Sequence, residues 1–139
     1  MSIFLDTGFY FALLAKKDTN HQRAVKILSE LTEGIHGQIY TSNFVFDESM
    51  TLLNVRTGGN RKDLLDRMRS LFLGRAPIAK MISVENRTLD QIAALQIKLT
   101  KKTNPISFTD CSTIFLCNER KIPKIVSFDD HYQGLLTQV

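Results

Sequence analysis

The sequence predicts an α/β fold: a three-layer α/β/α sandwich in which helices cover both faces of a central, mostly parallel sheet. Short apolar runs alternate along the chain with longer segments whose apolar residues recur at helical spacing. Strands separated by helices pair in parallel through right-handed crossovers, so helices fall on both faces of the sheet. The three prolines, Pro77, Pro105 and Pro123, all lie between the periodic segments, where proline is tolerated.

The first part of the chain predicts two strands with two helices between them. Residues 3–5 form a short apolar run typical of a buried strand, and the apolar residues at 8–15 predict a short helix. Asn20 is a residue type that caps helices, and the apolar positions that follow it recur at near-helical spacing as far as residue 31. Residues 38–41 then predict a second strand.

A helical hairpin is expected next. Its first helix begins at Ser42 or Asn43 and ends near Arg56, where a Gly-Gly pair interrupts the pattern. Its second helix covers residues 60–73, in which apolar residues again recur at helical spacing. The short connection between the two helices predicts that they pack side by side.

The last part of the chain continues the alternation of strands and helices. Residues 80–84 predict a third strand and residues 87–102 a helix with an apolar face. A further helix at 109–120 is so apolar that we expect it to be central. Residues 124–127 predict the closing strand, and 129–136 a short turn or helix.

The length and composition are those of a folded globular protein. With 139 residues, of which 43% are hydrophobic and 23% charged, the chain can bury a core, and we expect residues 1–139 to form a single domain. No stretch approaches the roughly 20 apolar residues that span a bilayer. The apolar start of the chain contains Asp6, which is unlike the apolar region of a signal peptide. We therefore expect a cytoplasmic protein with no membrane partner.

Asp6, Asp110 and Asp129 are expected where this type of fold gathers ligands, outside the carboxyl ends of the strands, and Glu48 is a fourth acid within a helix. Asp6 directly follows the first predicted strand, and Asp129 follows the last one almost directly. Asp110 stands in the first turn of the central helix, and Glu48 lies inside the helix after the second strand. Clustered carboxylates repel one another unless a cation neutralises them, and their hard oxygens suit Mg²⁺ or Mn²⁺.

Each acid also has an ordinary structural role open to it. Asp6 can form an Asx-turn, Asp110 can cap its helix and Asp129 can shape a turn, since Asp is common at all these positions. Glu48 lies on a helix with two apolar stripes, so the periodicity leaves open whether it faces the core or solvent.

Several other kinds of site are excluded by spacing. Cys111 and Cys117 lie in a predicted helix about 9 Å apart along its axis, beyond the reach of a disulfide, which favours a reducing compartment. His21, His36 and His131 have no zinc-ligand spacing with one another or with the cysteines, so we expect them on the surface. The sequence contains no glycine-rich nucleotide loop and no GxSxG nucleophile motif.

Four segments together resemble the PIN domain family and, within it, the VapC-type toxins of toxin–antitoxin pairs. The resemblance begins with IFLDTGFYFALL around Asp6 and continues with TSNFVFDE around Glu48. It extends through SFTDC around Asp110 to IVSFDDHY, whose spacing matches Asp129. Each motif alone is weak, but the four occur in order at family-like intervals over essentially the full chain.

The resemblance implies a PIN-like fold and an endoribonuclease that hydrolyses RNA with one or two Mg²⁺ or Mn²⁺ ions. The metal-holding, catalytic acids would be Asp6, Glu48, Asp110 and Asp129. Hydroxyl groups that would orient the carboxylates or a water molecule are those of Thr7, Ser42 and Ser127. Asp47 beside Glu48, and Asp130 beside Asp129, leave the choice of acid open at two positions.

The resemblance also implies the partners: an RNA substrate such as tRNA or rRNA, a small cognate antitoxin, and a second copy of the chain in a homodimer. A net charge of +4 and a pI near 9.2 permit a nucleic-acid partner. The apolar stripe Phe46, Met50 and Leu53 would serve protein contacts if it is exposed, or the core if it is not.

Two alternatives remain within the family, and others outside it lack support. One is a PIN nuclease that processes RNA outside any toxin–antitoxin system. The other is a catalytically silent module that binds RNA or protein, whose mark would be a missing acid, and none is missing. Phosphatases and receiver domains carry other acid patterns after the first strand, which the segment DTGFY does not match.

Overall fold

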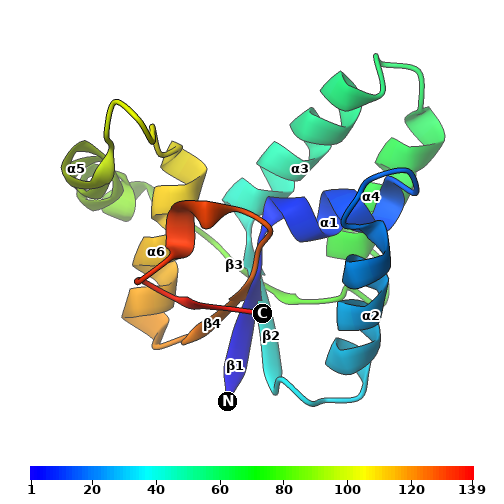
Figure 1. Ribbon diagram of the computed structural model, residues 1–139, viewed down its shortest axis with the longest axis horizontal. Helices are drawn as coiled ribbons and strands as arrows, with labels where there is room; N and C mark the ends of the chain where they lie inside the picture. Colours follow the sequence, from blue (N-terminus) through cyan, green and yellow to red (C-terminus); the bar gives the residue numbers. More distant parts are fainter.

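The computed structural model describes residues 1–139 and has one five-stranded sheet, in which all neighbouring strands are parallel. The strand order is β3-β2-β1-β4-β5, so the first strand lies in the centre (Figure 1). In register, Ile3 of the first strand stands between Ile39 and Lys124 of its two neighbours. The strands are β1 (Ser2–Leu5), β2 (Gln38–Ser42), β3 (Lys80–Ile82), β4 (Lys124–Val126) and β5 (Thr137–Gln138).

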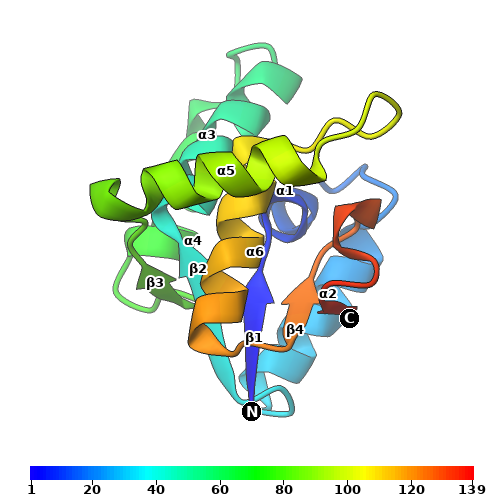
Figure 2. The same ribbon diagram turned by 90° about the vertical axis from the view of Figure 1, so that its left-hand side faces the viewer.

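Helices cover both faces of this sheet, which confirms the predicted three-layer α/β/α sandwich. Figures 1 and 2 show α5 and α6 on one face and α1, α2 and α4 on the other, while α3 projects beyond the carboxyl edge. No helix has the length and apolar character needed to cross a membrane. The α-helices are α1 (Thr7–Leu14), α2 (His21–Thr32), α3 (Asn43–Arg56), α4 (Lys62–Leu73), α5 (Leu89–Leu99) and α6 (Phe108–Arg120); two short 3₁₀ helices are η1 (Asn86–Thr88) and η2 (Asp130–Tyr132).

The core is built around β1 and α6. Ile3, Phe4 and Leu5 of β1 are fully buried, because the strand is paired on both edges and covered by helices on both faces. Helix α6 is buried over most of its surface, as expected for a central helix. Its two cysteines, Cys111 and Cys117, are buried and free, and both lie in one helix as the sequence predicts.

Helix α3 resolves the question of its two apolar stripes. Val45, Ser49 and Leu53 are fully buried along one line of the helix, whereas Phe46 and Met50 beside this line are of intermediate burial. Phe46 packs edge-on against Phe72 of α4, with ring centroids 5.2 Å apart, so the predicted hairpin is confirmed. Of the two roles left open for the stripe Phe46, Met50 and Leu53, the structure supports the core, because Leu53 belongs to it and Phe46 and Met50 pack against it.

The structure differs from the predictions at three places: strand β5, the N-cap of α2 and the end of α5. Strand β5 was not predicted, because it is only two residues long and lacks an apolar pattern. Asn20 occupies the N-cap position of α2, but its side chain makes no capping hydrogen bond; its own N–H instead donates to Asp18 Oδ2 at 3.0 Å. Helix α5 ends at Leu99, and the following residues form a turn closed by a bridge between Lys101 and Asn104.

Replacing Ser42 should destabilise the fold, because its fully buried hydroxyl caps α3 by accepting a hydrogen bond from Val45 N–H at 3.1 Å. We expect Ser42→Ala to lower the free energy of unfolding by about 1 kcal/mol, measured by urea denaturation. Ser70→Ala, an exposed serine within α4, is the matched control and should leave it nearly unchanged. Equal stabilities of the two variants would contradict this role for the cap.

Candidate functional site

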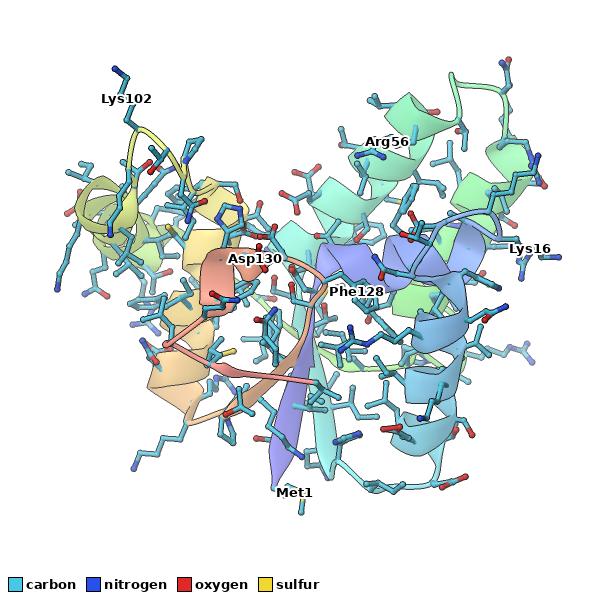
Figure 3. All side chains as sticks on the ribbon, viewed as in Figure 1. Met1, Lys16, Arg56, Lys102, Phe128 and Asp130 are labelled. Carbon is cyan, nitrogen blue, oxygen red and sulfur yellow. The ribbon has the colours of Figure 1, made fainter.

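A pocket of about 670 Å³ opens at the carboxyl edge of the sheet, where β1, α3, α6 and the segment after β4 converge. No lysine or arginine is among its lining residues. Figure 3 shows Asp130 and Phe128 at this edge, far from Met1 at the opposite end of the strands. The ionisable lining residues are Asp6, Glu48, Asp110, Asp129, Asp130 and His131.

Asp6 lies in the pocket because β1 ends directly before it. Its backbone N–H continues the sheet by donating to Val126 O at 3.1 Å, which fixes the residue at the end of the central strand. Asp6 is also the N-cap residue of α1, yet its carboxylate makes no capping hydrogen bond. Oδ2 accepts a hydrogen bond from the Ser127 hydroxyl at 3.1 Å, while Oδ1 is buried without a partner. The side chain of Asp6 therefore points into the pocket, although aspartate is a residue type that commonly caps helices.

Glu48 and Asp110 approach Asp6 from two helices. Glu48 lies in the second turn of α3 and is half-buried, and Asp110 lies in the first turn of α6 and is buried. Asp110 does not cap α6, because Ser107 does so by accepting from Asp110 N–H at 3.0 Å. The Tyr132 hydroxyl donates to Asp110 Oδ1 at 3.0 Å. Carboxylate oxygens of Asp6, Glu48 and Asp110 all lie within 4.8 Å of one another.

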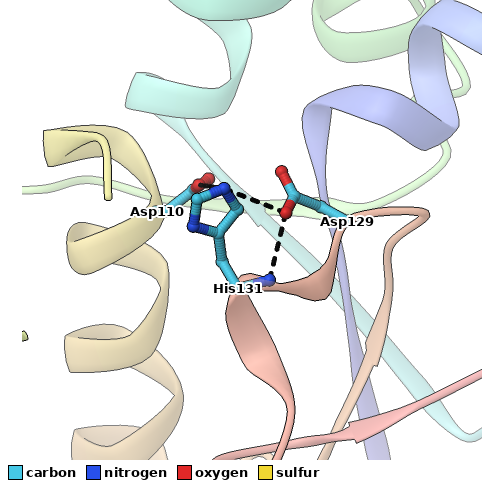
Figure 4. Close-up of side chains that lie close together, drawn as sticks. All are labelled: Asp110, Asp129 and His131. Atoms are coloured by element: carbon cyan, nitrogen blue, oxygen red, sulfur yellow. Dashed lines mark hydrogen bonds and ion pairs between the residues drawn. The ribbon is translucent and has the colours of Figure 1, made fainter. Parts of the chain in front are cut away.

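Asp129 and His131 form a second group with Asp110. Asp129 Oδ1 accepts a hydrogen bond from the His131 backbone N–H at 3.0 Å, so this acid does shape a turn. The same oxygen lies 3.0 Å from His131 Nε2, which in turn lies 3.9 Å from Asp110 Oδ2. Figure 4 shows the imidazole edge between the two carboxylates. Donor atoms of this group also lie within 4.8 Å of one another.

His131 is the site residue that the sequence did not reveal. The expectation of a surface histidine is wrong here, since its side chain is only 19% exposed and lies beside the acids. His36 is buried as well, against Glu30 and Lys124, and His21 is partly buried against a backbone carbonyl. The only sequence signal for His131 is its place two residues after an acid at the end of the closing strand.

The hydroxyl residues suggested by the family resemblance take up different positions. Thr7 lines the pocket, and its buried hydroxyl has no hydrogen-bond partner. Ser127 also lines it, and its hydroxyl donates to Asp6 and accepts from the Asp129 N–H at 3.1 Å. Ser42 is not among the lining residues and caps α3. Exposed Asp130 lines the pocket.

The surroundings of the pocket disfavour the charged forms of its two buried acids, Asp6 and Asp110, and so raise their pKa values. Burial raises the pKa of Asp6 to about 7, and the neighbouring charges of Asp110 and Glu48 act in the same direction. Burial likewise raises the pKa of Asp110, although its hydrogen bond from Tyr132 opposes the shift. The pKa of Tyr132 is also raised, by burial first and then by Asp6 and Asp110, so this phenol remains a hydrogen-bond donor.

Comparison with known proteins matches residues 3–135 to the family model of the PIN domain. The chain belongs to the PIN domain family. This PIN domain is 25% identical over 132 residues to a VapC ribonuclease of Archaeoglobus fulgidus, a match that covers 95% of this chain and 80% of the relative.

Solved structures agree with this PIN fold. The VapC20 toxin of Mycobacterium tuberculosis, which cleaves the sarcin–ricin loop, superposes with a TM-score of 0.80 at 23% identity, covering 99% of this chain and 98% of that one. VapBC2 of Rickettsia felis, solved bound to a promoter DNA fragment, gives a TM-score of 0.66 at 15% identity, covering 100% of this chain and 98% of that one.

The donor atoms of this PIN domain fit a hard divalent cation. Asp6, Glu48 and Asp110 offer only oxygen, which Mg²⁺ and Mn²⁺ prefer. The unpartnered Oδ1 of Asp6 is a buried acceptor without a donor, and a buried anionic oxygen of this kind is costly unless a cation meets it. Because no lysine or arginine lines the pocket, the protein supplies no such permanent charge itself.

The raised pKa of Asp6 predicts a pH-dependent stability for the metal-free protein. The folded chain keeps this proton up to about pH 7, whereas the unfolded chain releases it near the ordinary value of 3.8. Because the folded state binds more protons in this window, its free energy of unfolding should fall as pH rises through it, by roughly 2–3 kcal/mol between pH 5 and 8. Urea denaturation in EDTA at both pH values measures the change.

Asp6→Asn should flatten this pH dependence, because an amide does not titrate and also relieves the repulsion felt by Asp110. Asp66→Asn, an exposed acid on α4, is the control and should keep the wild-type slope. An Asp6→Asn protein whose stability falls as steeply as that of wild type would show that another group is responsible.

Proposed function

We propose that this PIN domain is a Mg²⁺- or Mn²⁺-dependent endoribonuclease, the toxin of a VapBC-type pair, which hydrolyses RNA phosphodiester bonds. The observation that carries the proposal is the convergence of four acids from separate elements in one pocket without a lysine or arginine. Similarity to a VapC ribonuclease over 95% of the chain supports the same activity.

In this proposal Asp6, Glu48, Asp110 and Asp129 hold the cation. When bound, the ion supplies Lewis-acid stabilisation of the phosphate and lowers the pKa of a water molecule. The Ser127 hydroxyl contacts both Asp6 and the backbone of Asp129, so a single group sets the positions of two acids.

Two further hydroxyl groups act on the same pocket. Tyr132 holds Asp110 Oδ1 by donating a hydrogen bond to it, which leaves Oδ2 on the side of His131. The Thr7 hydroxyl is buried at the pocket and has no hydrogen-bond partner in the protein.

Basic residues near the pocket would attract the RNA backbone. Leu52 lines the pocket, and Arg56 follows one turn later on the same face of α3. On the other side, Asn104 lines the pocket and belongs to a turn that also carries Lys101 and Lys102. Figure 3 shows Arg56 and Lys102 on opposite sides of Asp130, above the pocket. The backbone of an RNA such as tRNA or rRNA would therefore contact these basic side chains on its way to the acids.

The proposal includes a small antitoxin, a homodimer and a cytoplasmic location. The antitoxin is supported by the likeness to VapBC2, a toxin–antitoxin complex, and by the toxin relatives. The homodimer rests on the family resemblance alone, since exposed apolar residues such as Val25, Val55 and Ile97 are scattered over several helices. The absence of a membrane-spanning helix is compatible with the cytoplasm.

Asp6→Asn should lower RNA cleavage by more than about 100-fold, because it removes a negative cation ligand and keeps the size of the side chain. The assay incubates purified protein with tRNA and with an rRNA fragment in Mg²⁺ or Mn²⁺, then in EDTA. Wild type should lose activity in EDTA and recover it when the metal is restored.

Asp47→Asn is the matched control for this assay. Asp47 neighbours Glu48 on α3, but it is exposed and does not line the pocket, so its variant should cleave as wild type does. Cleavage that survives both Asp6→Asn and EDTA would disprove the metal-dependent mechanism.

Induced expression in a bacterial host should separate the toxin role from an RNA-processing role. We expect wild type to arrest growth, Asp6→Asn to leave growth unaffected, and co-expression of a small protein encoded directly upstream to restore growth. Growth rate and the integrity of cellular tRNA and rRNA are the measurements. Active wild-type enzyme that leaves growth and these RNAs intact would favour a processing nuclease.

A further inference from the structure

A strip along the outer face of α1 leads away from the acidic pocket. Gly8, Phe11 and Ala15 follow one another at helical spacing, and each is partly exposed, whereas most of the residues between them are buried. This α1 strip begins at the pocket, because Gly8 is one of the lining residues, and it ends beside the exposed Lys16. Figure 3 shows Phe128 at the pocket end of α1 and Lys16 at the other end.

Two arginines border the α1 strip, and each lies over a phenylalanine ring. The Arg23 guanidinium of α2 lies 5.4 Å from the ring centroid of Phe128. That ring borders the strip, since a Cβ atom added at Gly8 would lie 3.7 Å from Phe128 Cδ2. The Arg56 guanidinium of α3 lies 5.7 Å from the ring centroid of Phe11, which belongs to the strip itself. Both arginine–phenylalanine pairs therefore lie along the same short helix.

Neither of these two arginines is neutralised by the protein. Both are exposed, and the ion pairs of the chain include neither of them. Arg23 donates one hydrogen bond, to Val139 O at 3.1 Å, which helps to hold its guanidinium beside the ring. By contrast, Arg61, Arg69 and Arg87 are each paired with an acid. The α1 strip thus offers two unpaired positive charges to a ligand.

We propose that the α1 strip, together with Arg23 and Arg56, binds an unpaired, single-stranded stretch of RNA beside the bond to be cleaved. The inference rests on the proposed function and adds the form of the substrate and its path out of the pocket. Single-stranded RNA has phosphates that pair with arginine, and exposed base faces that stack on aromatic rings and guanidinium planes. From Gly8 to Ala15 the helix rises by roughly 10 Å, the length of about three stacked nucleotides.

Continuity with the pocket and positive charge favour RNA as the occupant. An RNA chain with a phosphate at the acids has to continue over a neighbouring surface, and the α1 strip starts at the pocket itself. Exposed Lys16 and Lys17 add positive charge at its far end, where Asp18 is the acid that follows them. A double helix keeps its bases stacked inside, so it offers phosphates to the arginines but no base faces to the rings. The strip is therefore better matched by a single strand.

Binding of short oligonucleotides, measured without cleavage, tests this inference. The full chain carrying Asp6→Asn is titrated in Mg²⁺ with a fluorescein-labelled single strand of about eight nucleotides and followed by fluorescence anisotropy. Arg23→Ala and Arg56→Ala, added singly, should each weaken binding by about 5-fold or more and reduce the slope of log affinity against log salt by about 0.7. A blunt duplex of the same sequence should bind at least about 5-fold more weakly than the single strand.

Further variants separate stacking from charge. Arg56→Lys keeps the positive charge but lacks the flat guanidinium, so it should recover only part of the affinity lost in Arg56→Ala. Phe11→Leu removes the ring from an apolar position and should weaken binding of the single strand by about 5-fold or more. Arg67→Ala, exposed on α4, and Phe115→Leu, half-buried on α6, are the matched controls and should bind as the parent protein does.

The outcomes separate this inference from the proposed function. Equal binding of single strand and duplex, or unchanged affinity in both alanine variants, would overturn the inference and leave the metal-dependent nuclease standing. If those variants bind RNA normally but the upstream-encoded protein no longer restores growth, the strip is a protein-binding surface, and the inference is again overturned. If the chain binds neither form of RNA, this inference and the proposed function fail together.

Discussion

Repulsion between carboxylates is the constraint on which the rest of this structure depends. Asp6, Glu48 and Asp110 come from separate parts of the chain, yet their oxygens lie within 4.8 Å of one another. Burial withdraws much of the water that would screen these charges, and the pKa values of Asp6 and Asp110 are raised as a result. The hydrogen bonds from Ser127 and Tyr132 offset only part of the cost. The surrounding fold has to hold the acids together against this force.

The centre of the sheet provides the required rigidity. Strand β1 is paired on both edges, and Asp6 continues its pairing through a hydrogen bond to Val126, so the acid has little freedom to move away. Asp110 is equally confined, because α6 is buried over most of its surface and Ser107 caps its first turn. Glu48 is fixed by the buried line of α3, which packs beside α1, α4 and α6. The packing that stabilises the core therefore also fixes the positions of the three acids.

The sequence predicted the fold more fully than the side-chain contacts of the site. Apolar periodicity located every α-helix and four of the five strands, since those segments bury a recognisable face. It missed β5, which has no such face, and the caps show the limit of residue preference: Ser42 caps its helix with its side chain and Asn20 does not. The pocket position of His131 depends on a turn formed through Asp129, which spacing alone does not reveal. Side-chain partners are decided by tertiary packing, and a pattern along one chain carries little of that information.

Asp110 belongs to both groups of donor atoms in the pocket. A change of charge at one group therefore alters the free energy of placing a charge at the other, and thermodynamic linkage makes the effect equal in both directions. A single aspartate in the first turn of α6 thus makes the pocket one coupled electrostatic unit.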